Sequence, residues 1–249
     1  LRNSRNFTNK CRRKLQPKGG KTSREKMGTS KIKTVLFFAF LLVSFKASHA
    51  SVPAAPPSFT FESWTCGSVT LPYRKALIAA GSGQPLPILV VYLHGGPKRG
   101  SDNKRQMQEQ AIFTIADYLK ARNIHAVMLV PQCPDSLMWG VGTNETIGRL
   151  IEDYTGRGEV DAHRVYLLGG SMGGTGSWLI ASAYPQLFAA VMPVAGNPET
   201  ADSESLANTP IYTVMGGNDR LMTIPRVSAF VERLKEACGT VVMDIEEEW

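Results

Sequence analysis

The sequence lacks a long apolar run and has few residues suited to metal binding. Its longest apolar stretch, Val35–Phe45, covers eleven residues, whereas about 20 are needed to span a bilayer. The four cysteines and four histidines form no CxxC pair and no cluster with metal-ligand spacing. We therefore expect no membrane-spanning helix, no metal site and no other cofactor.

Acidic residues are scarce only at the start of the chain. Residues 1–50 hold 13 Lys and Arg against one acidic residue, whereas residues 51–249 hold 15 against 20. The formal net charge of +7 therefore comes from the first 50 residues, and the remaining 199 are near −5. An acidic domain argues against nucleic acid as a partner.

The first 50 residues divide into two parts. Residues 1–26 are basic without apolar periodicity, which is typical of upstream translated sequence or a disordered basic segment. In residues 27–50, Lys31 and Lys33 precede the apolar run, and the small residues Ser48 and Ala50 follow it, which is the pattern of a secretory signal peptide. We expect a secreted or periplasmic protein without a stable membrane anchor after cleavage. The odd number of cysteines that remain leaves the disulfide pairing open.

Residues 51–249 alternate buried β-branched runs with helical patterns. This alternation predicts one α/β domain, with a mostly parallel sheet and helices on both faces. We expect strands at 87–93, 125–130, 164–168, 189–196, 210–217 and 240–246. We expect helices at 104–121, 145–154, 176–184 and 225–238.

The segment RVYLLGGSMGG (164–174) places Ser171 between a buried strand and a predicted helix. Its G-x-S-x-G pattern is typical of a sharp strand–turn–helix that exposes a nucleophilic serine. A phosphate-binding turn is the alternative, but it needs a lysine that Thr175-Gly176-Ser177 does not supply. We predict that Ser171 is a nucleophile.

Two backbone N–H groups are candidates to stabilise an oxyanion beside this serine. Met172 follows it, at the start of a helix whose free N–H groups favour negative charge. The glycine-rich segment LHGGPKRGSDN (93–103) follows the first buried strand, and Gly96 is the second candidate donor, since Pro97 has no N–H. The alternative is a loop that only turns the chain.

An acid and a substrate-lining residue complete the candidate site. Asp219 follows the strand at 210–217, at the edge where α/β sheets collect their functional groups. A carboxylate there can orient and charge-balance an imidazole, and Glu199 and Asp202 are alternative acids. Trp139, in the loop after a buried strand, is a candidate to line the substrate, with packing at the rim as the alternative.

The chain resembles the α/β-hydrolase superfamily, and within it the secreted esterase and depolymerase-like branch. That branch includes poly-hydroxyalkanoate depolymerase-type and feruloyl-esterase-type enzymes and predicted peptidases. The resemblance implies a Ser–His–Asp hydrolase of esters, with Ser171 as nucleophile and Asp219 as acid. The residues that carry it are 92–103, 130–140, 161–178, 184–196 and 216–225.

The same resemblance implies a histidine after the acid, and none follows Asp219. His49 lies in the leader, while His125 and His163 begin their strands and so lie at the wrong edge of the sheet. His94 belongs to the glycine-rich loop, where we expect a structural role. We therefore expect the α/β-hydrolase domain of 51–249 to be C-terminally truncated and the chain to have little esterase activity.

The leading hypothesis is a secreted serine esterase acting on small-molecule or polymeric esters of carbohydrate-linked or polyester type. It would form an acyl-enzyme on Ser171. A serine peptidase of prolyl-oligopeptidase type is one alternative, although the short chain without propeller-like repeats weighs against it. A non-catalytic relative that binds its ligand and lacks the histidine is the other.

We predict that the signal peptide is removed after Ala50, because small residues at 48 and 50 fit the peptidase's recognition pattern. N-terminal sequencing of the exported protein should begin at Ser51. An exported protein that still carries the apolar run would contradict the prediction.

Overall fold

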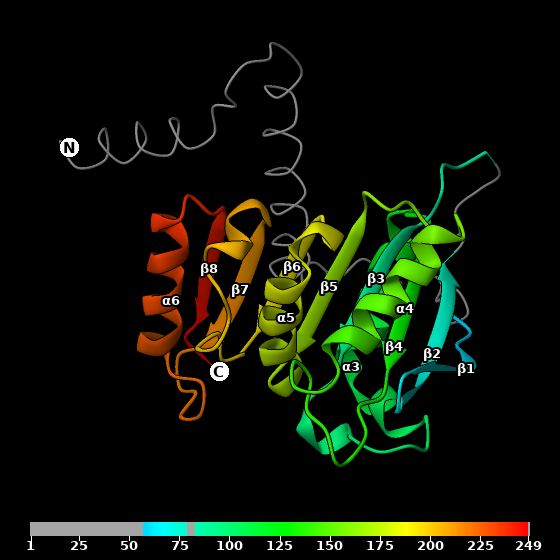
Figure 1. The fold of residues 1–249 in the computed structure, drawn as a ribbon, viewed down its shortest axis with the longest axis horizontal. Coiled ribbons are helices and arrows are strands. Elements are labelled where there is room, and N and C mark those ends of the chain that lie inside the picture. The colour runs from blue at the N-terminus through cyan, green and yellow to red at the C-terminus, as the bar shows by residue number, and fades with distance from the viewer. Residues whose placement is uncertain (1–56, 79–82, 249) are drawn as a thin grey trace, which may run out of the picture.

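A computed structural model describes residues 57–78 and 83–248, and the two leader segments, 1–26 and 27–50, lie outside these residues. Eight strands form one sheet in the order β1-β2-β4-β3-β5-β6-β7-β8 (Figure 1). The strands are β1 (Thr60–Cys66), β2 (Val69–Ile78), β3 (Ile88–Leu93), β4 (Ala126–Pro131), β5 (Val165–Gly170), β6 (Ala190–Val194), β7 (Ile211–Gly216) and β8 (Val241–Glu246). The helices labelled in Figure 1 are α3 (Gln110–Ala121), α4 (Asn144–Gly156), α5 (Met172–Ala183) and α6 (Ile224–Glu236).

The sheet is mostly parallel, as the buried apolar runs predict. Strands β3 to β8 pair parallel with one another, while β1 and β2 pair antiparallel and β2 pairs antiparallel with β4. Strands β3, β4 and β7 are buried along their whole length, which explains why their sequences show no polar alternation. This is the mostly parallel α/β sheet expected from the sequence.

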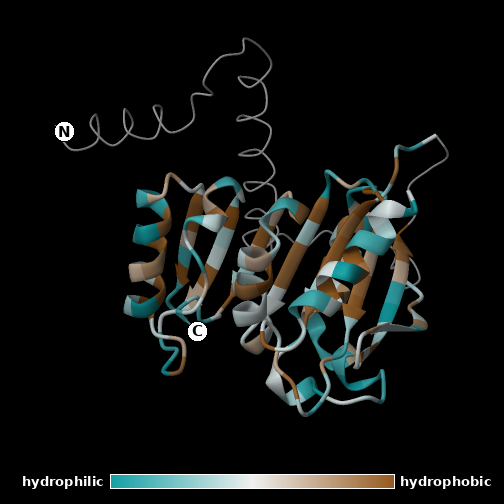
Figure 2. Cartoon of the chain, viewed as in Figure 1, coloured by the Kyte–Doolittle hydropathy of each residue, from teal (hydrophilic) through white to brown (hydrophobic). Residues whose placement is uncertain are grey.

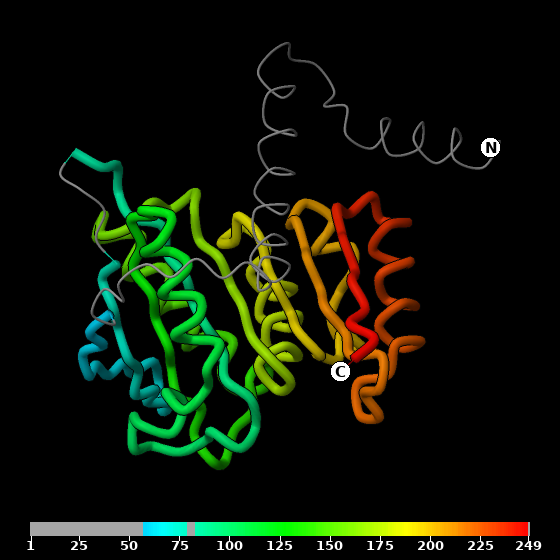
Figure 3. The backbone as a smooth tube through the Cα atoms, turned by 180° about the vertical axis from the view of Figure 1, so that it is seen from behind, coloured from blue at the N-terminus to red at the C-terminus, as the bar shows by residue number. Residues whose placement is uncertain are grey.

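Helices pack on both faces of the sheet. Figure 1 shows α4, α5 and α6 on the near face, and Figure 3, seen from behind, shows α3 on the far face. Each face has its own apolar core: one contains Trp178 and Phe230 from the near-face helices, and the other contains Ile112 and Leu119 from α3. Figure 2 shows the strands as mostly hydrophobic, with hydrophilic residues on the outer sides of the helices.

The chain order creates a switch point between β3 and β5. From β3 the chain crosses through α3 to β4 on one side, and then through α4 to β5 on the other. The connections that leave β3 and β5 at their carboxyl ends therefore diverge, and it is at such switch points that open α/β sheets place their functional groups. The glycine-rich loop and Ser171 follow these two strands.

The structure corrects three of the sequence-based boundaries. The antiparallel hairpin β1–β2 was not expected, and it turns at Gly67, whose φ is +57°. The helix expected at 104–121 is a 3-10 turn at Arg105–Gln108 followed by α3, with extended backbone at Glu109 between them. Helix α5 begins at Met172 rather than at residue 176, because its glycines pack against the sheet instead of forming a loop.

Two further observations concern the described residues alone. Cys66 and Cys133 are free thiols. None of the helices formed by residues 57–78 and 83–248 is long and apolar enough to cross a membrane.

The N-terminus of α5 sits very close to the ends of the neighbouring strands. A Cβ added to Gly173 would lie 1.9 Å from the carbonyl oxygen of Leu93, at the end of β3. Neither backbone can move independently, because Leu93 is in the sheet and Gly173 is in the helix. A glycine at position 173 is therefore required for α5 to approach β3.

We predict that Gly173→Ala lowers the free energy of unfolding by several kcal/mol, since overpacking against backbone commonly costs about 1–3 kcal/mol and occasionally more. Gly156→Ala is the matched control, because a Cβ there meets nothing within 4 Å. Alanine favours helix, so the control should be neutral or more stable by up to about 1 kcal/mol. Urea denaturation of both variants tests this, and equal stabilities would contradict it.

Candidate active site

Ser171 stands on a strained turn between β5 and α5. Its φ of 56° and ψ of −118° are unusual for a residue with a side chain, and such a conformation costs on the order of 1–3 kcal/mol. Hydrogen bonds hold it on both sides: its N–H donates to the Val194 carbonyl and its carbonyl accepts from the Thr175 N–H, each at 2.9 Å. The serine itself is exposed, so this turn presents the hydroxyl at the carboxyl edge of the sheet.

The start of α5 supplies donors next to this hydroxyl. Met172 is the first residue of the helix, and the N–H groups of a first helical turn have no acceptor within the helix. Together with the helix dipole they favour negative charge beside Ser171. The Met172 N–H is therefore placed as the sequence predicts for one oxyanion donor, and that role stays a prediction.

The glycine-rich loop lies against Ser171 from the other side of the switch point. A Cβ added to Gly95 would be 3.8 Å from the Cβ of Ser171. The Gly95 carbonyl accepts from the Lys98 N–H at 3.1 Å and lies 2.7 Å from Nδ1 of His94. Because a trans peptide is planar, the N–H of Gly96 points away from that carbonyl. These bonds fix the direction of the second predicted oxyanion donor.

The side chain of His94 is a neutral imidazole that fixes the Gly95–Gly96 peptide. Its Nε2 accepts a hydrogen bond from the Cys133 N–H at 2.9 Å, so Nδ1 carries the proton and donates to the Gly95 carbonyl. Complete burial lowers the pKa of the imidazole to about 4. Both ring nitrogens are occupied, Nδ1 by the loop and Nε2 by the segment after β4. His94 is therefore a structural residue rather than a base for Ser171.

Trp139 does not line an open substrate pocket, contrary to the sequence-based expectation. Its side chain is only 1% exposed, and its Nε1 donates to the His94 carbonyl at 3.0 Å. The indole and imidazole rings meet edge to face with centroids 5.1 Å apart. Through this hydrogen bond and ring contact, the indole of Trp139 supports the glycine-rich loop. The neighbouring Met138 is 49% exposed and faces outward instead.

A buried amide network holds the far end of the same loop, and sequence reasoning missed it. Asn103 has a φ of 52° and is 8% exposed. Its side-chain amide donates to the Tyr73 carbonyl at 3.0 Å, and its N–H donates to Oε1 of Gln132 at 2.6 Å. These bonds tie the loop to β2 and to the segment after β4. An Asn in a Gly-rich turn after a buried strand was the available signal, since Asn tolerates positive φ.

Asp219 lies in the turn after β7, at the same edge as Ser171. One strand, β6, separates β7 from β5, which places the two strands about 10 Å apart. That spacing leaves room for a ring between the two groups. Oδ1 of Asp219 accepts from the N–H groups of Leu221 and Met222 at 2.8 and 2.9 Å, which fixes the carboxylate in its turn.

The two alternative acids are engaged elsewhere. Glu199 lies 3.8 Å from Nε of Arg226 in an ion pair. Asp202 accepts from the Glu204 N–H at 2.9 Å and so closes a local turn. Asp219 remains the predicted acid, because it lies directly behind a buried strand end and forms none of the ion pairs found among the described residues.

No imidazole of the described residues faces Ser171. His125 precedes β4 and its Nδ1 is 3.0 Å from the Pro85 carbonyl. His163 precedes β5, so it lies at the amino edge of the sheet, roughly 20 Å from Ser171 along a strand of six residues. With both ring nitrogens of His94 occupied, residues 57–78 and 83–248 bring together the serine, the donors and the acid without a base.

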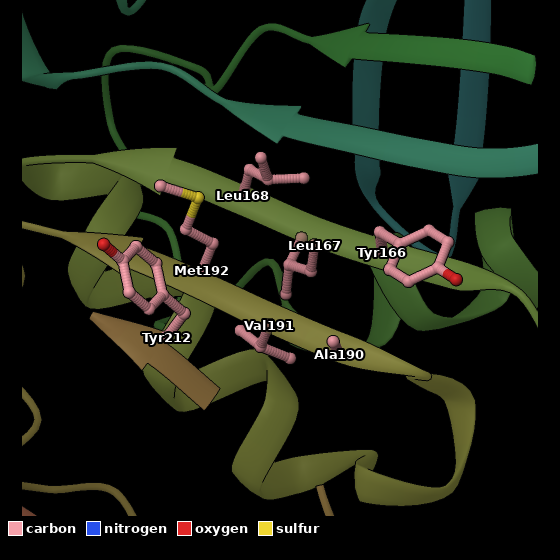
Figure 4. A pocket seen from close by; sticks show the side chains of 7 residues that line it. All are labelled: Tyr166, Leu167, Leu168, Ala190, Val191, Met192 and Tyr212. Atoms are coloured by element: carbon pink, nitrogen blue, oxygen red, sulfur yellow. The ribbon is translucent and has the colours of Figure 1, made fainter. Parts of the chain in front are cut away.

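The apolar depression in Figure 4 is separate from these residues. It lies over the middle of β5, β6 and β7. The hydroxyl of Tyr212, one of its lining residues, donates a hydrogen bond to Asp244. Neither Ser171 nor Asp219 lines it. Its lining residues are Tyr166, Leu167, Leu168, Ala190, Val191, Met192 and Tyr212. Among the described residues, no group of three His, Cys, Asp or Glu side chains gathers as a metal site.

Comparisons with known proteins agree with this architecture. Residues 132–245 match the dienelactone hydrolase family. A thermostable esterase of known structure is 25% identical, with a TM-score of 0.69 over 77% of this chain and 55% of that one. The resemblance to the α/β-hydrolase superfamily inferred from the sequence is thus confirmed.

More distant structures share the fold alone. An acylaminoacyl peptidase from Pyrococcus horikoshii is 14% identical, with a TM-score of 0.59 over 77% of this chain and 37% of that one. A puromycin hydrolase is also 14% identical, with a TM-score of 0.59 over 80% and 37%. The chain therefore spans about half or less of the length of these three structures. No curated protein matched the chain in sequence.

We predict that burial of His94 makes the protein acid-labile. The pKa of the folded ring, about 4, lies below its ordinary value of 6.5, so between these values the unfolded chain binds a proton that the folded chain does not. Stability is complete above pH 6.5 and falls as the pH drops towards 4. At pH 5 the loss relative to pH 8 should be about 2 kcal/mol.

Urea denaturation at pH 8 and pH 5 measures this loss. The matched variant is His94→Gln, whose amide does not titrate. It should be less stable at pH 8, since one hydrogen bond is lost, but its stability should change less between the two pH values. A wild-type protein equally stable at pH 5 and pH 8 would contradict the prediction.

Proposed function

We propose that this member of the α/β-hydrolase superfamily is a serine hydrolase that cleaves carboxylic esters through an acyl-enzyme on Ser171. The observation that carries the proposal is the strained, exposed conformation of Ser171 (φ 56°) at the N-terminus of α5. A serine that only packs or binds has no use for such a conformation, which costs stability. This weighs against a non-catalytic, ligand-binding role.

The proposed reaction begins with attack of the Ser171 hydroxyl on the ester carbonyl. The oxygen that becomes negative is stabilised by the N–H groups of Met172 and Gly96, whose directions are fixed before substrate arrives. A base must accept the serine proton and return it to the leaving alcohol, and Asp219 would orient and charge-balance that base. The acyl-enzyme is then hydrolysed by water.

The base is the part of this mechanism that the described residues do not provide. Without it the serine hydroxyl stays protonated at neutral pH, and the leaving alkoxide has no proton donor. A serine hydrolase that lacks one triad member keeps only about 10³–10⁴-fold acceleration over water from its oxyanion donors and binding. We therefore propose that the 249-residue chain by itself turns over esters slowly.

The proposed substrates are small-molecule or polymeric esters of carbohydrate-linked or polyester type, and we propose that the protein acts outside the cytoplasm. The leader pattern of residues 27–50 supports this location. The acidic composition of residues 51–249 supports a partner other than nucleic acid. A peptidase acting through the same serine is the second candidate, since the same arrangement can attack an amide.

We predict that a fluorophosphonate probe labels Ser171 in the full-length protein, meaning the product of its whole reading frame. The probe should not label the Ser171→Ala variant. The neighbouring Ser177, buried in α5 and bonded to the Gly173 carbonyl at 2.8 Å, supplies the control variant Ser177→Ala, which should still be labelled. Mass spectrometry of the labelled peptide identifies the modified residue. Labelling of Ser171→Ala equal to that of wild type would rule out Ser171 as the nucleophile.

A further inference from the structure

A carboxylate that has no part in the proposed triad lies beside the serine. Glu109 occupies the extended position between the 3-10 turn and α3. Its Oε1 accepts from the Gly95 N–H at 2.6 Å, and its Oε2 accepts from the Tyr92 hydroxyl at 2.7 Å. Two directed bonds, one to each oxygen, hold the carboxylate in place.

The carboxylate is close to Ser171. A Cβ added to Gly95 would be 3.2 Å from Oε1 of Glu109 and 3.8 Å from the Cβ of Ser171. Both atoms therefore lie near one point, and they are separated by no more than about 7 Å. Ser171 is exposed and Glu109 is half-buried, so a substrate at the serine passes within reach of this charge.

No basic side chain neutralises Glu109 within the described part of the chain, since it takes part in none of the ion pairs there. The two cations of the adjacent loop are bonded to other groups. Lys98 donates to Oε1 of Gln108 at 3.0 Å. Arg99 donates to the carbonyls of Gly96 and Asp135 at 3.3 and 3.1 Å.

An unneutralised negative charge is unfavourable beside a centre that becomes negative during ester cleavage. The two like charges repel each other, and in a half-buried site at this distance the repulsion slows the reaction measurably. A positive charge on the substrate removes this penalty, because it pairs with the carboxylate. A negative charge on the substrate increases it.

We propose that Glu109 is a specificity-determining residue, which makes the Ser171 site favour esters with a cationic group near the scissile carbonyl and reject esters with an anionic one. This inference rests on the proposed function of Ser171. It deepens that function by giving the substrate a charge class. The discrimination expected from one charge at about 7 Å is roughly tenfold in kcat/KM.

The test uses three p-nitrophenyl butanoates that differ only at the terminal carbon, which carries a trimethylammonium, a tert-butyl or a sulfonate group. The ammonium and tert-butyl groups have nearly the same shape, so their comparison isolates charge. Full-length wild type, Glu109→Gln and Glu236→Gln are assayed with each ester. Glutamine keeps an acceptor for the Gly95 N–H and can donate to the Tyr92 oxygen, while it removes the charge.

Wild type should prefer the ammonium ester to the sulfonate ester, and Glu109→Gln should lower that ratio about tenfold. Its rate on the tert-butyl ester should rise by up to about tenfold, because the repulsion between the carboxylate and the developing oxyanion is removed. Glu236→Gln removes an exposed carboxylate at the end of α6 and should keep the wild-type ratio. Added salt should reduce the ratio in wild type, because it screens the interaction.

Two results would overturn the proposal. One is an unchanged ratio in Glu109→Gln. The other is loss of tert-butyl ester turnover by a folded Glu109→Gln, which would make the residue a positioning group for the loop. Failure of the proposed function is recognised separately, since Ser171→Ala would then hydrolyse all three esters as fast as wild type.

Discussion

The backbone conformation of Ser171 is the constraint on which the rest of the site depends. A positive φ at a non-glycine residue persists only when its surroundings hold it. Here the Val194 carbonyl fixes the serine N–H, and α5 is pressed so closely on β3 that residue 173 has no room for a side chain. The serine is exposed because strand, turn and helix leave it no other direction. The positions of Met172 and Gly95 follow from the same close packing.

Much of this fold could be predicted from the sequence, because fully buried parallel strands are continuous apolar runs. PILVVYL contains β3, and HAVMLV and RVYLL contain most of β4 and β5. The hairpin β1–β2 was missed because its residues alternate between exposed and half-buried positions along β1, and no apolar run marks them. The start of α5 was placed too late, because glycines that allow close packing look like loop residues when only the sequence is known.

Site residues that directly follow a strand could be predicted, because the order of strands and helices fixes their edge of the sheet. Side-chain contacts between distant parts of the chain could not be predicted. Ser171 and Asp219 follow strand ends, so their edge of the sheet could be inferred. The burial of Trp139 could not, because an aromatic in a loop looks the same whether it faces solvent or supports the backbone beneath it. Glu109 was hidden inside a predicted helix, and only the break at that residue turns its side chain back towards Gly95.

The support beneath the glycine-rich loop has an entropic consequence. The ring of His94 is hydrogen-bonded to the Gly95 carbonyl, and the indole of Trp139 donates a hydrogen bond to the His94 carbonyl. The loop is therefore already ordered in the free protein. A loop that became ordered only on binding would lose backbone entropy in every catalytic cycle, at about 1–2 kcal/mol per residue. Here that entropy is lost once, during folding, so in the proposed reaction binding would not have to order the loop again.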